Sequence, residues 1–344
     1  MRVNKIDNTT NVNESLHSFL ASKEYTHIAI LVDKNTLKHC YPLLKNLPEH
    51  DLMIIESGED QKTISTCIDV WQGLTDNQFD RNGLMINLGG GVIGDLGGFC
   101  ARTFKRGMDF INIPTTLLAQ VDASIGGKLG VDFNGFKNHV GIFSEPDLVI
   151  IDTVFLKTLP KSELKSGFAE IIKHHLIADD KAWSKLLSTK WDAMNWPSLV
   201  KHSINIKKAV VKKDPNEKGL RKTLNFGHTL GHAIESHYLP SPSPLLHGEA
   251  IAIGMIGESY LSYKKMMITK EELDQITNYI NSVYTKINIA DSDLGVIMKN
   301  IRQDKKNKGN IILAALLNGI GTAVWDCQIN DEDIAEALMY YNQT

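Results

Sequence analysis

The sequence has few cysteines, and none lie close together along the chain. Its 344 residues contain no Cys-x-x-Cys pair, so the sequence predicts no thiolate metal site. A low cysteine content also fits a reducing compartment, where disulfides are rare. The four cysteines are Cys40, Cys67, Cys100 and Cys327.

Long apolar runs and an excess of one charge are also missing. No stretch reaches about 18 uninterrupted apolar residues, so no membrane-spanning helix is predicted. Polar residues follow residues 1–5, where a signal peptide would need an apolar segment. The formal net charge of −3 gives no general attraction to nucleic acid or to an anionic membrane. We therefore expect a cytoplasmic protein that binds neither.

The apolar content is large enough to build two domains. Over 344 residues, 42% are hydrophobic and 22% are charged, as in an ordinary soluble protein. Apolar runs rich in β-branched residues alternate with helical patterns such as 64–74, which predicts a parallel α/β sheet. The predicted strands are 28–32, 52–55, 84–88, 110–113 and 148–151.

From about residue 161 the apolar spacing changes to the helical period, and most later segments are predicted helices. One exception is a predicted β-hairpin, formed by 311–317 and 322–325 around a glycine-containing turn. We therefore expect a Rossmann-like α/β domain at residues 1–160 and a mainly α-helical domain at 161–344.

Three histidines form the most informative pattern. His228 and His232 are four residues apart, which places them on one face of a helix, and His247 precedes the apolar segment 250–257. Three imidazoles at one point are typical of a metal or proton-transfer site. The alternative is that these rings are hydrogen-bonded in a core.

A glycine-rich segment, 89–95, directly follows the predicted strand 84–88. It contains G-x-G-x-x-G, and its glycines allow a phosphate to approach the start of the next helix. A tight turn would look the same, and the strand is not the first of the sheet, so a standard Rossmann fingerprint is not expected. Asp33 ends the first of these strands, where it would bind a ribose hydroxyl or form a turn.

Cationic residues beside glycines or in predicted loops favour an anionic substrate. Lysines next to glycines suit a phosphate site, although any single one is more often a solvated surface charge. The set comprises Arg106, Lys128, Lys137, Arg221, Lys305 and Lys306.

Glu170 lies off the apolar stripe of a helix predicted to begin at Ser162. It shares a face with Glu163, Gly167 and Lys173 or His174, and that face is either solvated or a site. Gly167 costs about 1 kcal/mol of helix stability relative to alanine, which favours close packing against this face. A carboxylate with two histidines makes a zinc site that has an open position.

Several long motifs resemble, in order and spacing, those of the 3-dehydroquinate synthase family of sugar phosphate cyclases. The resemblance runs from about Asp33 to Lys306. Its motifs are 90–95 (GGVIGD), 114–122 (PTTLLAQVD), 126–128 (GGK), 137–138 (KN), 169–170 (AE), 225–232 (NFGHTLGH) and 247–249 (HGE).

The resemblance implies a division of roles among the histidines. Its zinc ligands match Glu170, His228 and His247, and Co²⁺, iron or manganese would suit the same ligands. His232 matches a residue that assists proton movement, so the resemblance argues against His228 and His232 as joint ligands.

The resemblance also implies an NAD site and a substrate site. The residues matching the NAD site are Asp33, Asn35, Glu59, Lys62, Gly90, Gly91, Val92, Asp95, Thr115, Thr116, Leu118, Lys128, Lys137, Phe155, Leu156 and Thr158. The residues matching the substrate and phosphate site are Arg106, Asp122, Lys128, Lys137, Asn138, Lys207, Arg221 and Asn225.

The implied reaction converts 3-deoxy-D-arabino-heptulosonate 7-phosphate into 3-dehydroquinate and phosphate, a step of the shikimate pathway. It combines transient oxidation by NAD, β-elimination of phosphate, re-reduction and an intramolecular aldol closure, with no net use of NAD. A homodimer is also implied. The sequence departs from the family at Leu129, Lys208 and 215–216.

Two other enzyme classes share these features. Another sugar phosphate cyclase, such as a 2-deoxy-scyllo-inosose synthase, would differ in pocket residues, and His232 with Lys137 and Asn138 argues against it. A metal-dependent polyol dehydrogenase of the glycerol dehydrogenase type would need no phosphate site. A binding module without catalysis would not need the three metal ligands.

Overall fold

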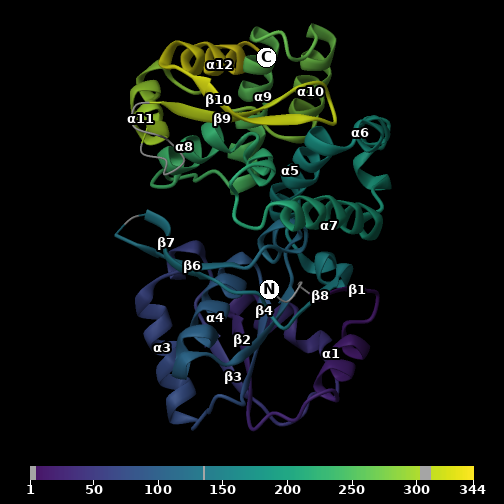
Figure 1. The fold of residues 1–344 in the computed structure, drawn as a ribbon, viewed down its shortest axis with the longest axis vertical. Coiled ribbons are helices and arrows are strands. Elements are labelled where there is room, and N and C mark those ends of the chain that lie inside the picture. The colour runs from purple at the N-terminus through teal and green to yellow at the C-terminus, as the bar shows by residue number, and fades with distance from the viewer. Residues whose placement is uncertain (1–4, 135, 303–310) are drawn as a thin grey trace. The chain divides into compact units, whose positions relative to one another are not determined.

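The computed structural model describes residues 5–134, 136–302 and 311–344 (Figure 1). These residues form two compact units. The first lies within Met1–Pro160 and Trp196–Ile204, and the second within Lys161–Asn195 and Asn205–Thr344. One helix, α7 (Trp196–Lys213), therefore contributes to both units.

The first unit contains a six-stranded sheet in the order β1-β8-β5-β4-β2-β3, in which every strand pair is parallel. All five predicted strands are confirmed, each within one residue of its predicted ends. The strands are β1 (Ile6–Thr9), β2 (Ile28–Asp33), β3 (Asp51–Ile55), β4 (Leu84–Gly89), β5 (Asp109–Pro114) and β8 (Leu148–Asp152).

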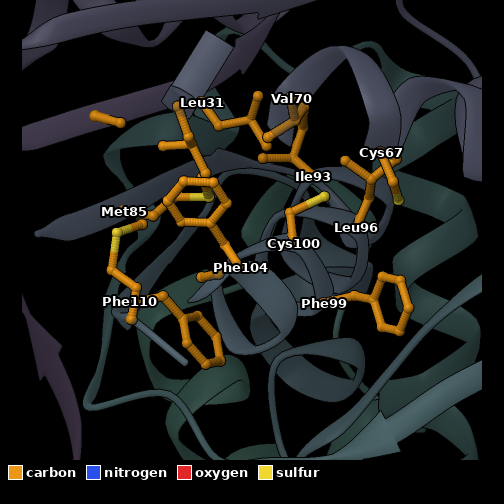
Figure 2. Packing of buried hydrophobic residues seen from close by; sticks show 14 of the residues in the cluster. Leu31, Cys67, Val70, Met85, Ile93, Leu96, Phe99, Cys100, Phe104 and Phe110 are labelled. Atoms are coloured by element: carbon orange, nitrogen blue, oxygen red, sulfur yellow. The ribbon is translucent and has the colours of Figure 1, made fainter. Parts of the chain in front are cut away.

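Both faces of this sheet are covered, which is why its strands are apolar at nearly every position. Along β2, Ala29 and Leu31 pack into one hydrophobic cluster, while Ile30 and Val32 pack into another on the opposite face. Figure 2 shows the first cluster, where Leu31 lies among side chains from the helices that cover this face. The helices of this unit are α1 (Val12–Leu20), α2 (Lys34–His39), α3 (Ile64–Asp76) and α4 (Gly91–Thr103).

An antiparallel hairpin, β6 (Lys128–Phe133) with β7 (Phe136–Phe143), packs against α4 and was not predicted. The contact is close because Gly98 has no side chain. A Cβ there would lie 2.7 Å from a methyl group of Leu129.

The second unit is mainly helical, as predicted, with one antiparallel hairpin. The helix that follows His247 is buried over the whole segment 250–257, which confirms the expectation for that apolar stretch. No helix in the described ranges is both long and apolar enough to cross a membrane. The elements are α5 (Lys161–Ala178), α6 (Asp180–Leu187), α8 (His228–Tyr238), α9 (His247–Lys264), α10 (Lys270–Val283), α11 (Asp291–Arg302), β9 (Ile312–Leu317), β10 (Ala323–Ile329) and α12 (Asp331–Gln343).

Candidate functional site

Three helices of the second unit bring one carboxylate and two imidazoles together. Oε1 of Glu170, on α5, lies 3.4 Å from Nε2 of His228 and 3.5 Å from Nε2 of His247. The Glu170 side chain is fully buried, and one ligand atom from each of the three residues lies within 4.8 Å of the other two. The alternative of a solvated face for Glu170 is therefore wrong.

Hydrogen bonds fix which nitrogen of each ring faces Glu170. Nδ1 of His228 lies 3.1 Å from the carbonyl oxygen of Phe226, and Nδ1 of His247 lies 3.1 Å from a carboxylate oxygen of Glu235. Because a carbonyl and a carboxylate only accept, each Nδ1 carries the proton. In its neutral form, each ring points the lone pair of Nε2 at another acceptor, the carboxylate of Glu170. Such an arrangement fits a cation between them, with the outer hydrogen bonds orienting its ligands.

In the metal-free protein the two rings differ in protonation. Burial and the nearby charge of Lys173 lower the pKa of His228 to about 4, so this ring is neutral near pH 7. Burial also lowers the pKa of His247, but hydrogen bonds to Glu170 and Glu235 outweigh it and raise the value to about 9, so a bound cation would displace a proton from this ring. Burial raises the pKa of Glu170, but the charges of Lys173 and His228 bring it well below its ordinary range.

His232 lies beside these rings. Its ring centroid is 4.9 Å from that of His228 and 5.8 Å from that of His247. With Glu235 and His247 it forms a second group whose ligand atoms also lie within 4.8 Å of one another. Since Nδ1 of His247 already donates to Glu235, we interpret Glu235 as an orienting group rather than as a ligand.

Backbone contact sets the spacing of the three helices. A Cβ on Gly248 of α9 would lie 2.0 Å from the carbonyl oxygen of Ser166 in α5. A Cβ on Gly254 would lie 2.0 Å from the carbonyl oxygen of Gly227, the residue that precedes α8. Only glycine allows the backbones to approach so closely.

Two of the predicted substrate residues lie just before α8, in the 3₁₀ segment η7 (Leu220–Asn225). Arg221 is buried and donates to the carbonyl oxygen of Pro215, while the side-chain amide of Asn225 donates to Glu217. Asp214 holds this segment by accepting hydrogen bonds from three backbone N–H groups, those of residues 218, 219 and 221. Lys207 is buried in the last part of α7.

In the first unit, the glycine-rich segment begins α4, with Gly90 as the N-cap residue. A cavity beside the first turn of this helix is lined by Gly91, Gly94, Asp95 and Lys128, among others. A backbone N–H cluster at a helix start, with glycines and a lysine around it, suits a phosphate group.

Lys62 connects the predicted cofactor segment to the hairpin. Its ammonium group lies 2.6 Å from a carboxylate oxygen of Asp95 and 2.7 Å from the side-chain oxygen of Asn138, and the Lys62 side chain is 5% exposed. Lys137, on the same hairpin, lies 4.0 Å from a carboxylate oxygen of Glu59. The structure therefore brings four of the predicted residues of the first unit into one region around Lys62.

Asp33 has a structural task. Its carboxylate accepts a hydrogen bond from the N–H of Thr36 and caps α2, which is the turn-forming alternative raised for this residue. The neighbouring Asn35 donates its N–H to Ser57. Capping does not conflict with a ribose contact, because a carboxylate accepts several hydrogen bonds.

The remaining predicted residues lie at different places in the first unit. Arg106 is exposed at the end of a short 3₁₀ turn, and Lys128 is exposed at the start of β6. Thr115, Thr116 and Leu118 follow β5, and Asp122 lies in the turn after them. Phe155, Leu156 and Thr158 lie in the 3₁₀ segment after β8, and Val92 lies in the first turn of α4. Lys305 and Lys306 fall outside the described residues.

Sequence reasoning gave no role to three charged residues that the structure buries around the metal group: Lys173, Glu235 and Glu258. The ammonium group of Lys173 forms an ion pair with Glu170. Glu258 was detectable in principle, because it is a lone carboxylate in an otherwise apolar stretch of α9.

Family profiles and individual relatives of this chain agree on one family. The profile of the 3-dehydroquinate synthase N-terminal domain matches residues 52–166, and that of its C-terminal domain matches residues 167–307. A 3-dehydroquinate synthase from Parabacteroides distasonis is 41% identical over 96% of this chain and 95% of its own length. Another, from Clostridium beijerinckii, is 43% identical over 86% of each chain.

A solved structure has the same fold. It is a 2-deoxy-scyllo-inosose synthase complexed with carbaglucose-6-phosphate, NAD⁺ and Co²⁺, with a TM-score of 0.84 and 24% identity over 97% of this chain and 95% of that one. The expected fold class, a Rossmann-like α/β part followed by a mainly helical part, is confirmed. With two matching profiles and relatives above 40% identity over most of its length, the chain belongs to the 3-dehydroquinate synthase family.

Proposed function

We propose that the protein is a 3-dehydroquinate synthase, an NAD- and metal-dependent lyase that converts 3-deoxy-D-arabino-heptulosonate 7-phosphate into 3-dehydroquinate and phosphate. The observation that carries this proposal is the convergence of Glu170, His228 and His247 in a member of this family. A protein that only binds a nucleotide would not need a buried carboxylate facing two oriented imidazoles.

The three ligands would hold Zn²⁺ or Co²⁺. When bound, the metal supplies Lewis acidity toward a substrate hydroxyl, and NAD supplies hydride acceptance and return. Glu170 brings the one negative charge of the ligand set, and Lys173 compensates it through an ion pair with the other carboxylate oxygen, Oε2. The hydrogen bonds from Nδ1 of His228 and of His247 keep Nε2 free of a proton for the metal.

The remaining roles fall to the chain's own polar groups. His232 would transfer a proton at its ring nitrogen, because its ring lies beside both ligand rings and is not one of the three ligands. Arg106, Lys128 and Lys137 would stabilise the negative charge of the departing phosphate. Asp122, Asn138, Lys207, Arg221 and Asn225 would hold the rest of the substrate.

The cofactor would bind in the first unit, around the start of α4 and Lys62. This supports a division of labour in which residues 1–160 bind NAD and residues 161–344 bind the metal and much of the substrate. A homodimer and a cytoplasmic location belong to the same proposal, and light scattering of the purified protein tests the first of them.

The test is a phosphate-release assay on the heptulosonate phosphate. Release should require both NAD and the divalent metal, and absorbance at 340 nm should show no accumulation of NADH. Protein stripped of metal by a chelator serves as the control and should regain activity with Zn²⁺ or Co²⁺. Stoichiometric NADH from a simple polyol would instead establish a dehydrogenase, and turnover of glucose 6-phosphate would establish a different sugar phosphate cyclase.

A further inference from the structure

A second fully buried carboxylate lies at the start of the helix that carries His228. Glu258, on α9, is 0% exposed. Its Oε2 accepts a hydrogen bond of 2.6 Å from the N–H of Gly227. Its Oε1 accepts bonds of 2.9 Å and 3.1 Å from the N–H groups of Thr229 and Leu230. One side chain from α9 therefore satisfies three backbone donors around the first turn of α8.

Helix α8 cannot cap itself. The first N–H groups of a helix have no partner within it, and a side chain at the N-cap position usually accepts from them. Here the N-cap residue is Gly227, at φ +81°. A Cβ at that position would lie 2.5 Å from Cγ of Met255 on α9, so no capping side chain fits. Glu258 supplies the missing acceptor from the neighbouring helix, and its negative charge suits the positive end of the α8 dipole.

The position of Glu258 along α9 connects it to the metal group. It follows His247 by about three helical turns, so both residues lie on the face of α9 that meets α8. At the His247 end, Glu235 of α8 accepts from Nδ1 of that histidine. At the other end, Glu258 of α9 accepts from the start of α8. Two buried carboxylates, one from each helix, thus fix α8 against α9, one at the turn that contains His228 and one about two turns further along α8.

We propose that Glu258 is a positioning residue of the metal centre, which holds the first turn of α8 so that His228 meets His247 and Glu170 at the ligand spacing. The proposal rests on the metal centre proposed above. It adds a residue outside the group of three ligands, which acts through the backbone N–H groups of residues 227, 229 and 230.

The variant Glu258→Gln tests this role, because it keeps the shape of the side chain and removes its charge. The matched control is Asp333→Asn. Asp333 is also a buried carboxylate, it accepts from the N–H of Asn330 before α12, and it binds Lys264 at the end of α9 away from His247. Both variants lose a buried charge that lies on α9 or accepts from its end, but only Glu258→Gln affects the start of α8.

The measurement is Co²⁺ binding to the metal-free proteins, followed by the visible absorption bands of bound Co²⁺ and by competition with a chelator. Glu258→Gln should bind Co²⁺ about tenfold more weakly and shift the bands, because groups that orient ligands typically control affinity by 10–100-fold. Asp333→Asn should change the affinity for Co²⁺ less than twofold. This should hold even if its thermal midpoint falls as much as that of Glu258→Gln. Hydrogen exchange at residues 227, 229 and 230 should become faster only in Glu258→Gln.

Wild-type affinity and spectrum in Glu258→Gln would overturn the proposal, as would an equal loss of affinity in both variants, which would indicate general destabilisation. If Glu258→Gln does not fold, the same measurements are made on Glu258→Asp. This variant keeps the negative charge, but its side chain is one methylene group shorter and moves the carboxylate away from the N–H groups of α8. Failure of the wild-type protein to bind Co²⁺ would overturn the metal centre itself, and with it the role of Glu258.

Discussion

The metal group and the cofactor region are built in opposite ways. In the second unit, the ligands come from three helices whose backbones touch, and each ligating ring is fixed by a further hydrogen bond. In the first unit, Arg106, Lys128 and Lys137 are exposed, while Lys62 is buried between Asp95 and Asn138. The metal group is therefore preorganised by packing, while most of the predicted cationic groups of the first unit lie at its surface.

The largest effect should come from removing a metal ligand. His247→Ala should lose the metal and lower kcat by about 10³-fold or more, because Lewis acid catalysis contributes several kcal/mol. Metal analysis after gel filtration, together with the phosphate-release assay, measures both. The matched control is His237→Ala, a histidine of α8 that faces Asp293 instead of the metal group and should retain the metal. Retention of metal in His247→Ala would contradict the assignment.

The next effect comes from breaking the buried ion pair between Lys62 and Asp95 in the cofactor region. Lys62→Met should destabilise the protein by about 3 kcal/mol, because Asp95 loses a buried partner. NAD binding should weaken, and Co²⁺ binding should stay unchanged. Urea denaturation and NAD titration measure these quantities.

The same substitution at Lys23 is its control, since the ion pair of Lys23 with Asp109 is half exposed. Lys23→Met should cost less than about 1 kcal/mol. If both substitutions lowered the free energy of unfolding equally, the ion pair of Lys62 would contribute no more than an exposed one.

A smaller effect separates proton transfer from metal binding. His232→Ala should keep the metal and lower kcat on the order of 10²-fold, as expected for loss of a general acid or base. Loss of the metal in this variant would instead make His232 a ligand, as in the simplest interpretation of the i, i+4 spacing.

The smallest effect should come from an exposed cation. Lys137→Ala should raise KM for the phosphorylated substrate about tenfold, while stability and metal content stay at wild-type values, since exposed pairs such as that with Glu59 contribute little. A loss of stability as large as that of Lys62→Met would show that Lys137 contributes as much to the free energy of unfolding as the buried Lys62.

Much of the fold was predictable, because strands buried on both faces are apolar along their whole length. β1 is an exception that follows from the same rule, because it has a single apolar residue and depends on its pairing with β8. The β6–β7 hairpin is different, because Leu129, Val131 and Phe133 alternate along β6 in a pattern that does predict a strand. That pattern was overlooked because the glycines around it indicate a loop.

The site was predictable where spacing alone places residues together, as for His228 and His232. For Glu170 the sequence left a solvated face open as an alternative, because its burial depends on tertiary packing around α5. Lys173, Glu235 and Glu258 were given no role for a related reason. A charged residue in a helix predicts solvent exposure, and only the tertiary contacts provide the ion pair or the N–H groups that make burial stable.

The glycine contacts of α9 also bear on how this protein can change over time. At Gly248 and Gly254 the helices meet through backbone atoms, so any side chain there would separate α9 from α5 or from the start of α8. Glycine is therefore required at both positions for as long as the ligand spacing is kept.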